Sequence, residues 1–229
     1  MKRLPNPDLA PYQRAEFFRI IPSRFPPISL YEAIYDTPEE LEIAYAIEAL
    51  TNPRVLQELG DLSLVAPSER VTGPGALIVM APFTHLSSQT RFSDGTFGVY
   101  YAAKSLETAI AETKYHRAYF LSQTNQPDQE IAMRVYSGKI KGRMLDIRPS
   151  VYAKLLNPSD YIDSQSFARV MRDGGAKGVL YSSVRHAVGY CVAVFRPTAV
   201  GIPKQRMHLK YVYSQSSQSI VQVYEAREL

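Results

Sequence analysis

The stretch Arg91–His116, RFSDGTFGVYYAAKSLETAIAETKYH, predicts a strand, a turn, a second strand and a helix in quick succession. Asp94-Gly95 is typical of a tight turn, because glycine adopts positive φ freely and an aspartate side chain can bond to nearby backbone. Phe97–Ala103 is rich in aromatic and β-branched residues, which predicts a half-buried strand. Ser105 is a good N-cap, and apolar side chains follow it at steps of three and four residues. We therefore expect the chain to reverse at Asp94 and to enter a helix after Ser105.

Glu112 lies on this helix beside its apolar face, and Arg91 and Tyr101 come from the two pieces of backbone that precede it. A carboxylate at the edge of an apolar helix face is costly to bury unless it has partners. The position therefore indicates either a structural ion pair or a functional site.

The rest of the chain predicts an α+β protein, with strands prominent in the second half and helices between them. Expected strands are Glu16–Ile21, with Arg19 inside it, Ala76–Phe83, whose continuous apolar character suggests burial on both faces, Ile131–Tyr136, Ile140–Ile147, Gly178–Arg185 and Gly189–Phe195. One expected helix is an N-terminal insertion over about 37–59, which opens on the capping box Thr37–Glu40. Another is Asp160–Asp173, with Ile162, Phe167, Val170 and Met171 inward. A C-terminal hairpin is expected over about 207–225.

Length and composition predict a single domain over 1–229, because a chain of this size buries a large core without disulfides. The single cysteine, Cys191, lies in an apolar run, which is typical of a buried thiol in a reducing compartment. No apolar run approaches the length of a membrane-spanning helix, and the start lacks the apolar segment of a signal peptide. We expect a cytoplasmic protein without a membrane partner.

The sequence lacks the motifs of several common binding and catalytic sites. GxxxxGK[ST], GxGxxG, HExxH and CxxC are absent, and the four histidines are far apart, so neither a nucleotide loop nor a metal site is expected. A triad of Ser183, His186 and Glu112 lacks the GxSxG elbow that exposes a hydrolase serine. The net charge of +4 is scattered, so direct DNA binding is not expected. A non-catalytic nucleic-acid-binding module stays open as an alternative, and its sign is salt-sensitive DNA binding.

Together, Arg91-Phe92, the Asp-Gly turn, Tyr101-Ala102-Ala103, Thr108-Ala109 with Glu112, and Tyr181–Arg185 resemble the RES family, which is named for a signature Arg, Glu and Ser. The resemblance spans Phe17 to about Pro197. It implies an ADP-ribosyltransferase-like mixed sheet with flanking helices, and NAD+ as the substrate.

The resemblance also implies roles for single residues. Glu112, Arg19 and Ser183 match catalytic positions, and Arg19, Arg91, Tyr101 and Ser183 match NAD-binding positions. Arg24 is the alternative to Arg19, because the segment between the first arginine and Arg91 is longer than in compact members of the family.

The chemistry of NAD+ agrees with these roles. Cleavage of the nicotinamide–ribose bond builds positive charge on the ribose, which one carboxylate can stabilise. The arginine fork suits the diphosphate, Tyr101 offers a flat face to nicotinamide, and Ser183 can orient Glu112 or the ribose. The structural alternatives are an Arg–Glu ion pair, a core tyrosine and a capping serine.

As function, the resemblance implies the toxin of a bacterial toxin–antitoxin pair that degrades NAD+ as a glycohydrolase or a phosphorylase, or else an ADP-ribosyltransferase that modifies a macromolecule. Its implied partner is an Xre-type helix-turn-helix antitoxin that covers the NAD site. A homodimer within the complex is one form that this assembly can take.

Overall fold

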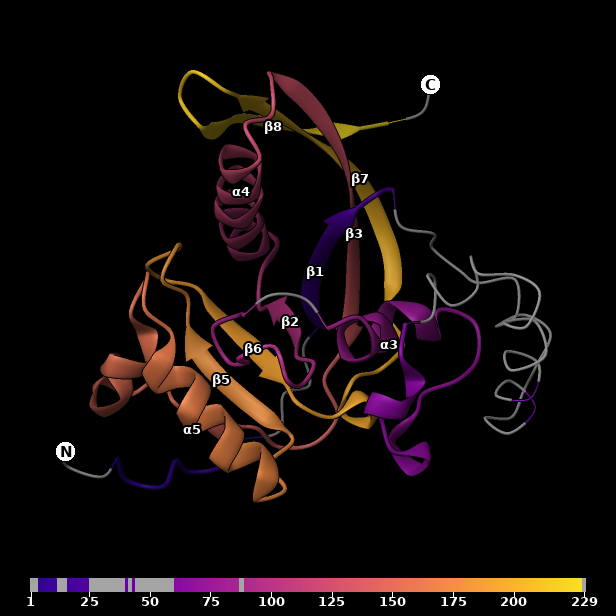
Figure 1. Ribbon diagram of the computed structural model, residues 1–229, viewed down its shortest axis with the longest axis vertical. Coiled ribbons are helices and arrows are strands. Elements are labelled where there is room, and N and C mark those ends of the chain that lie inside the picture. The colour runs from indigo at the N-terminus through magenta and orange to yellow at the C-terminus, as the bar shows by residue number, and fades with distance from the viewer. Residues whose placement is uncertain are drawn as a thin grey trace.

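The computed structural model describes residues 4–11, 16–24, 40, 43, 60–86 and 89–227. These residues form an eight-stranded sheet in the order β4-β5-β6-β2-β1-β3-β7-β8, flanked by helices (Figure 1). The strands are β1 (Glu16–Pro22), β2 (Tyr100–Ala103), β3 (Gln129–Lys139), β4 (Leu145–Asp146), β5 (Gly178–Ser182), β6 (Tyr190–Val194), β7 (Lys204–Ser214) and β8 (Ser219–Ala226). The described helices are α3 (Ala76–Thr84), α4 (Leu106–Gln123) and α5 (Ile162–Asp173), with 3-10 turns at Leu62–Leu64, Pro67–Glu69, Ser150–Leu156 and Pro197–Ala199. The predicted α+β class is confirmed.

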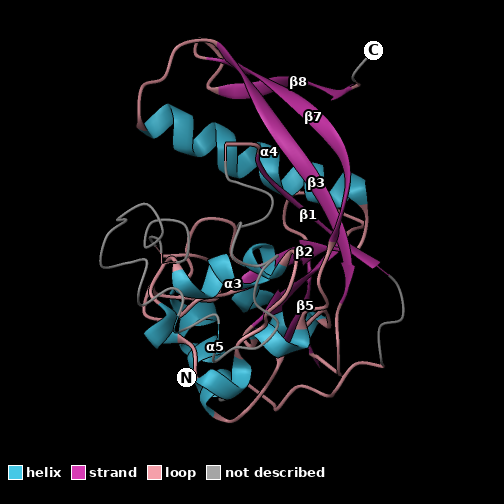
Figure 2. Cartoon of the chain, turned by 90° about the vertical axis from the view of Figure 1, so that its right-hand side faces the viewer, coloured by secondary structure: helices cyan, strands magenta, loops and turns pink. Residues whose placement is uncertain are grey.

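The sheet is mixed, because β4 and β5 are parallel and all the other neighbouring strands are antiparallel. At its centre β1 pairs with β3 from Glu16 to Pro22, but with β2 only at Phe18 and Ala103. The long strands β3 and β7 carry the sheet toward β8, whereas the short strands β5 and β6 lie at its other end beside α5 (Figures 1 and 2). β7 and β8 form the expected C-terminal hairpin.

Apolar side chains cover both faces of the sheet, as the alternation of side chains along strands requires. On one face Ile20, Ala103 and Tyr181 pack with Ala109 of α4 and Ala168 of α5. On the other face a second cluster holds Phe17, Tyr100, Ala102, Leu180 and Val192 together with Val79, Met80 and Phe83 of α3. The two clusters therefore place α4 and α3 on opposite faces of the sheet.

The predicted turn and helix start are confirmed. Asp94 Oδ1 accepts a hydrogen bond from the backbone N of Thr96, and Gly95 has φ of 93°. Ser105 caps α4, since its side-chain oxygen accepts from the backbone N of Thr108. Glu112 therefore lies in the second turn of a capped helix that packs on the sheet.

Four sequence predictions are wrong. The strand expected before the Asp94 turn does not form, because Arg91 and Phe92 lie in a tight turn closed by a bridge between Thr90 and Ser93. Ala76–Phe83 is not a strand but most of α3, which is buried nearly all round, and an apolar run without periodicity does not distinguish a buried strand from a buried helix. Ile140–Ile147 does not form one strand: Gly142 has φ of 91°, and only Leu145–Asp146 pair as β4. Of the four inward residues predicted for α5, Phe167 and Met171 pack against the core, but Ile162 and Val170 point outward with 70% and 62% of their surface exposed. Ser164 and Ala168 are the residues that α5 buries fully.

The helical insertion expected over about 37–59 lies outside the described residues, apart from Glu40 and Ile43. Within the part of the chain that the structure describes, none of the helices combines the length and the apolar character needed to cross a membrane.

Candidate functional site

The centre of the candidate site is a hydrogen bond between Glu112 of α4 and Ser183, the residue after β5. Ser183 Oγ donates to Glu112 Oε1 at 2.6 Å. Ser183 is buried, and the Glu112 side chain is 17% exposed. The other close partner of the carboxylate is His116, one turn along α4, whose Nε2 lies 3.9 Å from Oε2. No described arginine forms an ion pair with Glu112.

Ser183 also closes the turn that follows β5. Its Oγ accepts hydrogen bonds from the backbone N of Arg185 at 3.1 Å and of His186 at 3.0 Å. His186 Nδ1 in turn lies 2.8 Å from Thr108 Oγ1 at the start of α4. The expected capping serine is therefore present, and the same hydroxyl that closes the turn holds the carboxylate.

Tyr101 positions the backbone around Arg91. Its hydroxyl lies 2.9 Å from Thr90 Oγ1 and accepts from the backbone N of Phe92 at 3.0 Å. Burial raises the pKa of Tyr101 to about 12, and the hydrogen bonds to Thr90 and Phe92 partly oppose this rise. Tyr101 thus acts as a core tyrosine that fixes the neighbouring loop. Its predicted use as a flat face for nicotinamide stays a prediction.

Arg91 is buried and is held at both its backbone and its side chain. Ser164 Oγ of α5 donates to the Arg91 carbonyl oxygen at 2.6 Å. Nη1 of Arg91 donates to the carbonyl oxygen of Asn157 at 2.6 Å, and the guanidinium lies 4.7 Å from the centre of the Tyr161 ring. No described carboxylate pairs with this buried cation.

Arg19 lies apart from the Glu112–Ser183 pair. It shares the strand face of Phe17, and its guanidinium lies 4.6 Å from the centre of the Tyr100 ring, whereas Glu112 is on α4 at the opposite face. Its Nη1 donates to the Tyr101 carbonyl oxygen at 2.9 Å, its Nε is buried without an acceptor, and burial lowers its pKa. The structure does not bring Arg19 into contact with Glu112 or Ser183. Its role as a diphosphate-binding group stays a prediction, and Arg24, the alternative, is exposed in the turn after β1.

Arg185 is a candidate that the sequence analysis did not single out. Its guanidinium lies 3.4 Å from the centre of the Tyr115 ring of α4, and its Nη2 donates to the Pro158 carbonyl oxygen at 2.7 Å. The available signal was its place two residues after Ser183, at the polar tip of a strand. Tyr115 and Tyr161 gave no signal of their own, because only the fold brings them to the arginines.

Three arginines act on His116, which lies one turn along α4 from Glu112. Burial first, and then the charges of Arg185, Arg91 and Arg117, lower the pKa of His116, although 57% of its side-chain surface stays exposed. Burial and the nearby Glu112 carboxylate raise the pKa of the Cys191 thiol, which is therefore protonated and inert. Among the residues that the structure describes, no three His, Cys, Asp or Glu side chains are grouped as metal ligands would be.

This arrangement has a definite chemical capacity. One carboxylate, fixed by a hydroxyl and not neutralised by an arginine, can stabilise a developing positive charge. Arginines that contact carbonyl oxygens and aromatic rings, rather than carboxylates, keep donors for an anionic ligand. The site therefore suits a substrate that carries phosphate groups at one end and develops a cation at the other.

Comparisons with known proteins agree with the family resemblance seen in the sequence. A family model described as the RES domain matches residues 68–214, which is more than half of the chain. The uncharacterised protein y4oC of Sinorhizobium fredii is 31% identical over 219 residues, which cover 92% of this chain and 88% of the relative. A solved structure, the M. tuberculosis MbcT–MbcA toxin–antitoxin complex, matches at 14% identity and a TM-score of 0.38, over 56% of this chain and 74% of that one, a likeness too remote to carry a functional argument.

Proposed function

The chain belongs to the RES domain family, and we propose that it cleaves NAD+ at the nicotinamide–ribose bond. The observation that carries this proposal is how the Glu112 carboxylate is held and what it is not paired with. The carboxylate is held by Ser183 at 2.6 Å and is paired with no described arginine. The same Ser183 hydroxyl accepts from the backbone N of Arg185, whose side chain pairs with no described carboxylate.

In the proposed reaction the bond between the nicotinamide nitrogen and C1 of the ribose breaks, and its electron pair leaves with nicotinamide. The ribose is left with an oxocarbenium-like charge, and neutral nicotinamide needs no proton to depart. Glu112 stabilises this charge more strongly in the transition state than in bound NAD+, because the charge is delocalised onto the ring only as the bond breaks. Ser183 keeps the carboxylate in place through its short hydrogen bond.

The arginines serve the diphosphate of NAD+. Arg91 is held at a carbonyl oxygen and an aromatic ring, so its guanidinium is oriented before the substrate arrives. Preorganised donors of this kind bind anions without a further loss of side-chain entropy. Arg19 lies on the opposite strand face beside Tyr100 and contacts neither Glu112 nor Ser183, so its diphosphate-binding role rests on the family resemblance alone.

The acceptor of the ribosyl group decides the name of the reaction. Water gives ADP-ribose and makes the protein a glycohydrolase, whereas inorganic phosphate gives ADP-ribose-1″-phosphate and makes it a phosphorylase. A macromolecular side chain makes it an ADP-ribosyltransferase. All three use the same ribosyl cation and differ in the nucleophile that reaches it.

We further propose that the protein is the toxin of a toxin–antitoxin pair. An enzyme that destroys NAD+ harms the cell that makes it, so a partner must block the site until it is needed. An antitoxin with acidic groups would complement the arginines around Glu112 and be steered by the net charge of +4. Co-expression of the neighbouring reading frame should restore growth, and a neighbour that neither co-purifies nor restores growth would count against this pairing.

Incubation of the purified, partner-free protein with NAD+ tests the proposed reaction. We expect loss of NAD+ and release of an equal amount of nicotinamide, with the second product identified by mass spectrometry in the presence and absence of phosphate. Addition of a protein extract tests for a labelled macromolecular product. NAD+ that stays intact in contact with protein of confirmed fold would overturn the proposal.

A further inference from the structure

Two arginines from distant parts of the chain are held on one short segment, residues 157–161. Arg91 donates to the carbonyl oxygen of Asn157 at 2.6 Å, and Arg185 donates to the next carbonyl oxygen, that of Pro158, at 2.7 Å. The segment is itself fixed, because Asn157 Oδ1 accepts from the backbone N of Ser159 and of Asp160. Consecutive carbonyl groups of a fixed turn therefore bring the two guanidinium groups together.

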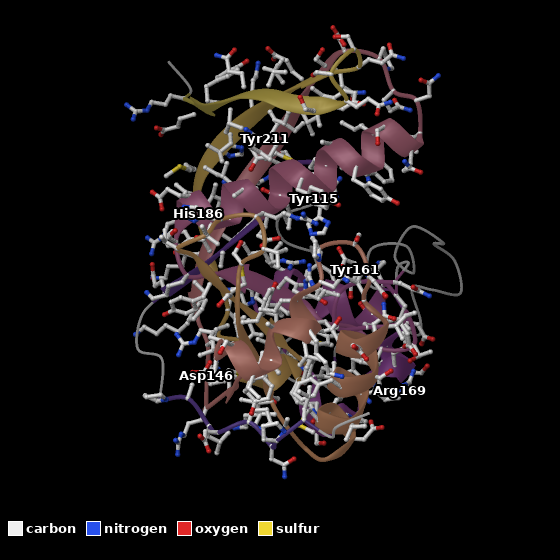
Figure 3. The ribbon with its side chains drawn as sticks, turned by 90° about the vertical axis from the view of Figure 1, so that its left-hand side faces the viewer. Tyr115, Asp146, Tyr161, Arg169, His186 and Tyr211 are labelled. Atoms are coloured by element: carbon white, nitrogen blue, oxygen red, sulfur yellow. The ribbon has the colours of Figure 1, made fainter. Side chains whose placement is uncertain are left out.

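An aromatic ring supports each of these guanidinium groups. The centre of the Tyr161 ring lies 4.7 Å from the Arg91 guanidinium, and that of Tyr115 lies 3.4 Å from the Arg185 guanidinium. Tyr115 belongs to α4 and Tyr161 is the residue that precedes α5. In the view of Figure 3, Tyr115 lies above Tyr161. A guanidinium has five N–H donors, and one bond to a carbonyl leaves most of them available.

Within the described residues, the charge of this pair has no carboxylate counter-ion. No described carboxylate forms an ion pair with Arg91 or Arg185, and Nε of Arg185 is buried without an acceptor. Both arginines also lower the pKa of His116, so both positive charges act on the same imidazole. Two cations held this close, one of them buried, are costly unless an anion joins them.

We propose that Arg91 and Arg185 together form the binding site for the phosphate groups of the substrate. The identity of the substrate rests on the proposed function, but the anion site itself does not. Arg185 is linked to the carboxylate by contacts: its backbone N donates to Ser183 Oγ, which donates to Glu112 Oε1, and its guanidinium lies over Tyr115 of α4. The phosphate groups would therefore lie next to Glu112. In NAD+ the diphosphate is attached to the same ribose whose bond to nicotinamide breaks, so a phosphate site beside Glu112 suits this substrate. Arg185 then supplies the second fork that the sequence analysis assigned to Arg19.

Titration with inorganic pyrophosphate tests the site without any turnover. We expect saturable binding by calorimetry and a higher melting temperature, at an ionic strength matched with chloride. Arg185→Gln should bind pyrophosphate at least about tenfold more weakly, because a hydrogen bond to a charged group is lost. Arg185→Lys should fall between the two, since it keeps the charge but not the fork. Arg227→Gln, an exposed arginine on the far hairpin, serves as the matched control and should bind like the parent.

A parent protein that pyrophosphate does not stabilise, or an Arg185→Gln variant that is folded and binds as tightly as the parent, would overturn the proposal. If Arg185→Gln does not fold, the same comparison is made with Arg185→Lys. With NAD+ as the ligand, Arg185→Gln should raise KM more than it lowers kcat. Pyrophosphate binding that depends on Arg185 in a protein without NAD+ cleavage would refute the proposed function and leave this site standing.

Discussion

Replacement of Ser183 by alanine removes one oxygen atom with three hydrogen bonds. Ser183 Oγ donates to Glu112 Oε1 at 2.6 Å and accepts from the backbone N of Arg185 and of His186. The backbone N of Ser183 keeps its own bond to the Gly189 carbonyl oxygen, so β5 is not disrupted. The substitution therefore loosens the carboxylate and the turn but leaves the strand in place.

The size of the effect follows from these contacts. Loss of a hydrogen bond to a charged carboxylate costs about 1.5–3 kcal/mol, which in a transition state is a rate reduction of about ten- to a hundredfold. Arg185 and His186 are half-buried, so water can replace the acceptor for their backbone N–H groups. We expect a stability loss of about 1 kcal/mol and a fall in melting temperature of about 2–4 °C.

Nicotinamide release and thermal melting, measured on the same preparation, check this expectation. Ser182→Ala is the matched control, because the neighbouring Ser182 is half-buried and its hydroxyl bonds to none of the described residues. A Ser183→Ala variant that melts lower yet turns over NAD+ within about twofold of the parent would show that Ser183 only caps the turn, and would refute the role we assign to its bond with Glu112.

Tyr101→Phe should lower the melting temperature by about 2–4 °C and raise KM for NAD+, because the lost hydroxyl bonds to Thr90 and Phe92 on either side of Arg91; an unchanged KM in steady-state kinetics would contradict this. The Thr96 hydroxyl and then Arg169 hold the pKa of Asp94 at about 2, below its value in the unfolded chain. The ionised Asp94 carboxylate therefore stabilises the fold above about pH 4, and this stabilisation is lost as the pH falls toward 2. Asp94→Asn should therefore lose less stability than the parent between pH 6 and pH 2 in denaturant titrations, and equal losses would disprove the link. Gly98→Ala should destabilise the fold by about 1–3 kcal/mol, because the added Cβ overlaps backbone atoms of α3, and a parent-like melting curve would contradict this packing.

The parts of the fold that were predictable from sequence are those with local causes. The Asp94 turn and the Ser105 cap depend on side chains that bond to backbone two or three residues away, and both are present. Ala76–Phe83 lacked such a cause, since an apolar run records burial but not periodicity. The helix is favoured by the packing of this segment against one face of the sheet, which the run of apolar residues does not reveal.

The candidate site also has residues that were predictable from sequence and residues that were not. Glu112 and Ser183 were expected together because both match motif positions of the RES family, and the structure joins them by a hydrogen bond of 2.6 Å. Arg185 on Tyr115 and Arg91 on Tyr161 were not predictable, because the turn at 157–158 and the two helices meet there only in the folded chain. Arg19 was selected by its unusual place in an apolar strand, but strand alternation put it on the other face of the sheet.

The most direct test of the account is Glu112→Gln, assayed for melting temperature and for the initial rate of nicotinamide release on one preparation, beside Glu225→Gln as a control for an exposed glutamate on the far hairpin. Glutamine keeps the size of the side chain and can still bond to Ser183, but it lacks the negative charge. We expect a rate lower by about a hundred- to a thousandfold, or about 2.7–4 kcal/mol, with NAD+ binding and melting temperature close to those of the parent. A variant that is clearly less stable yet cleaves NAD+ within a few-fold of the parent rate would show that Glu112 is part of the scaffold, and would contradict the account.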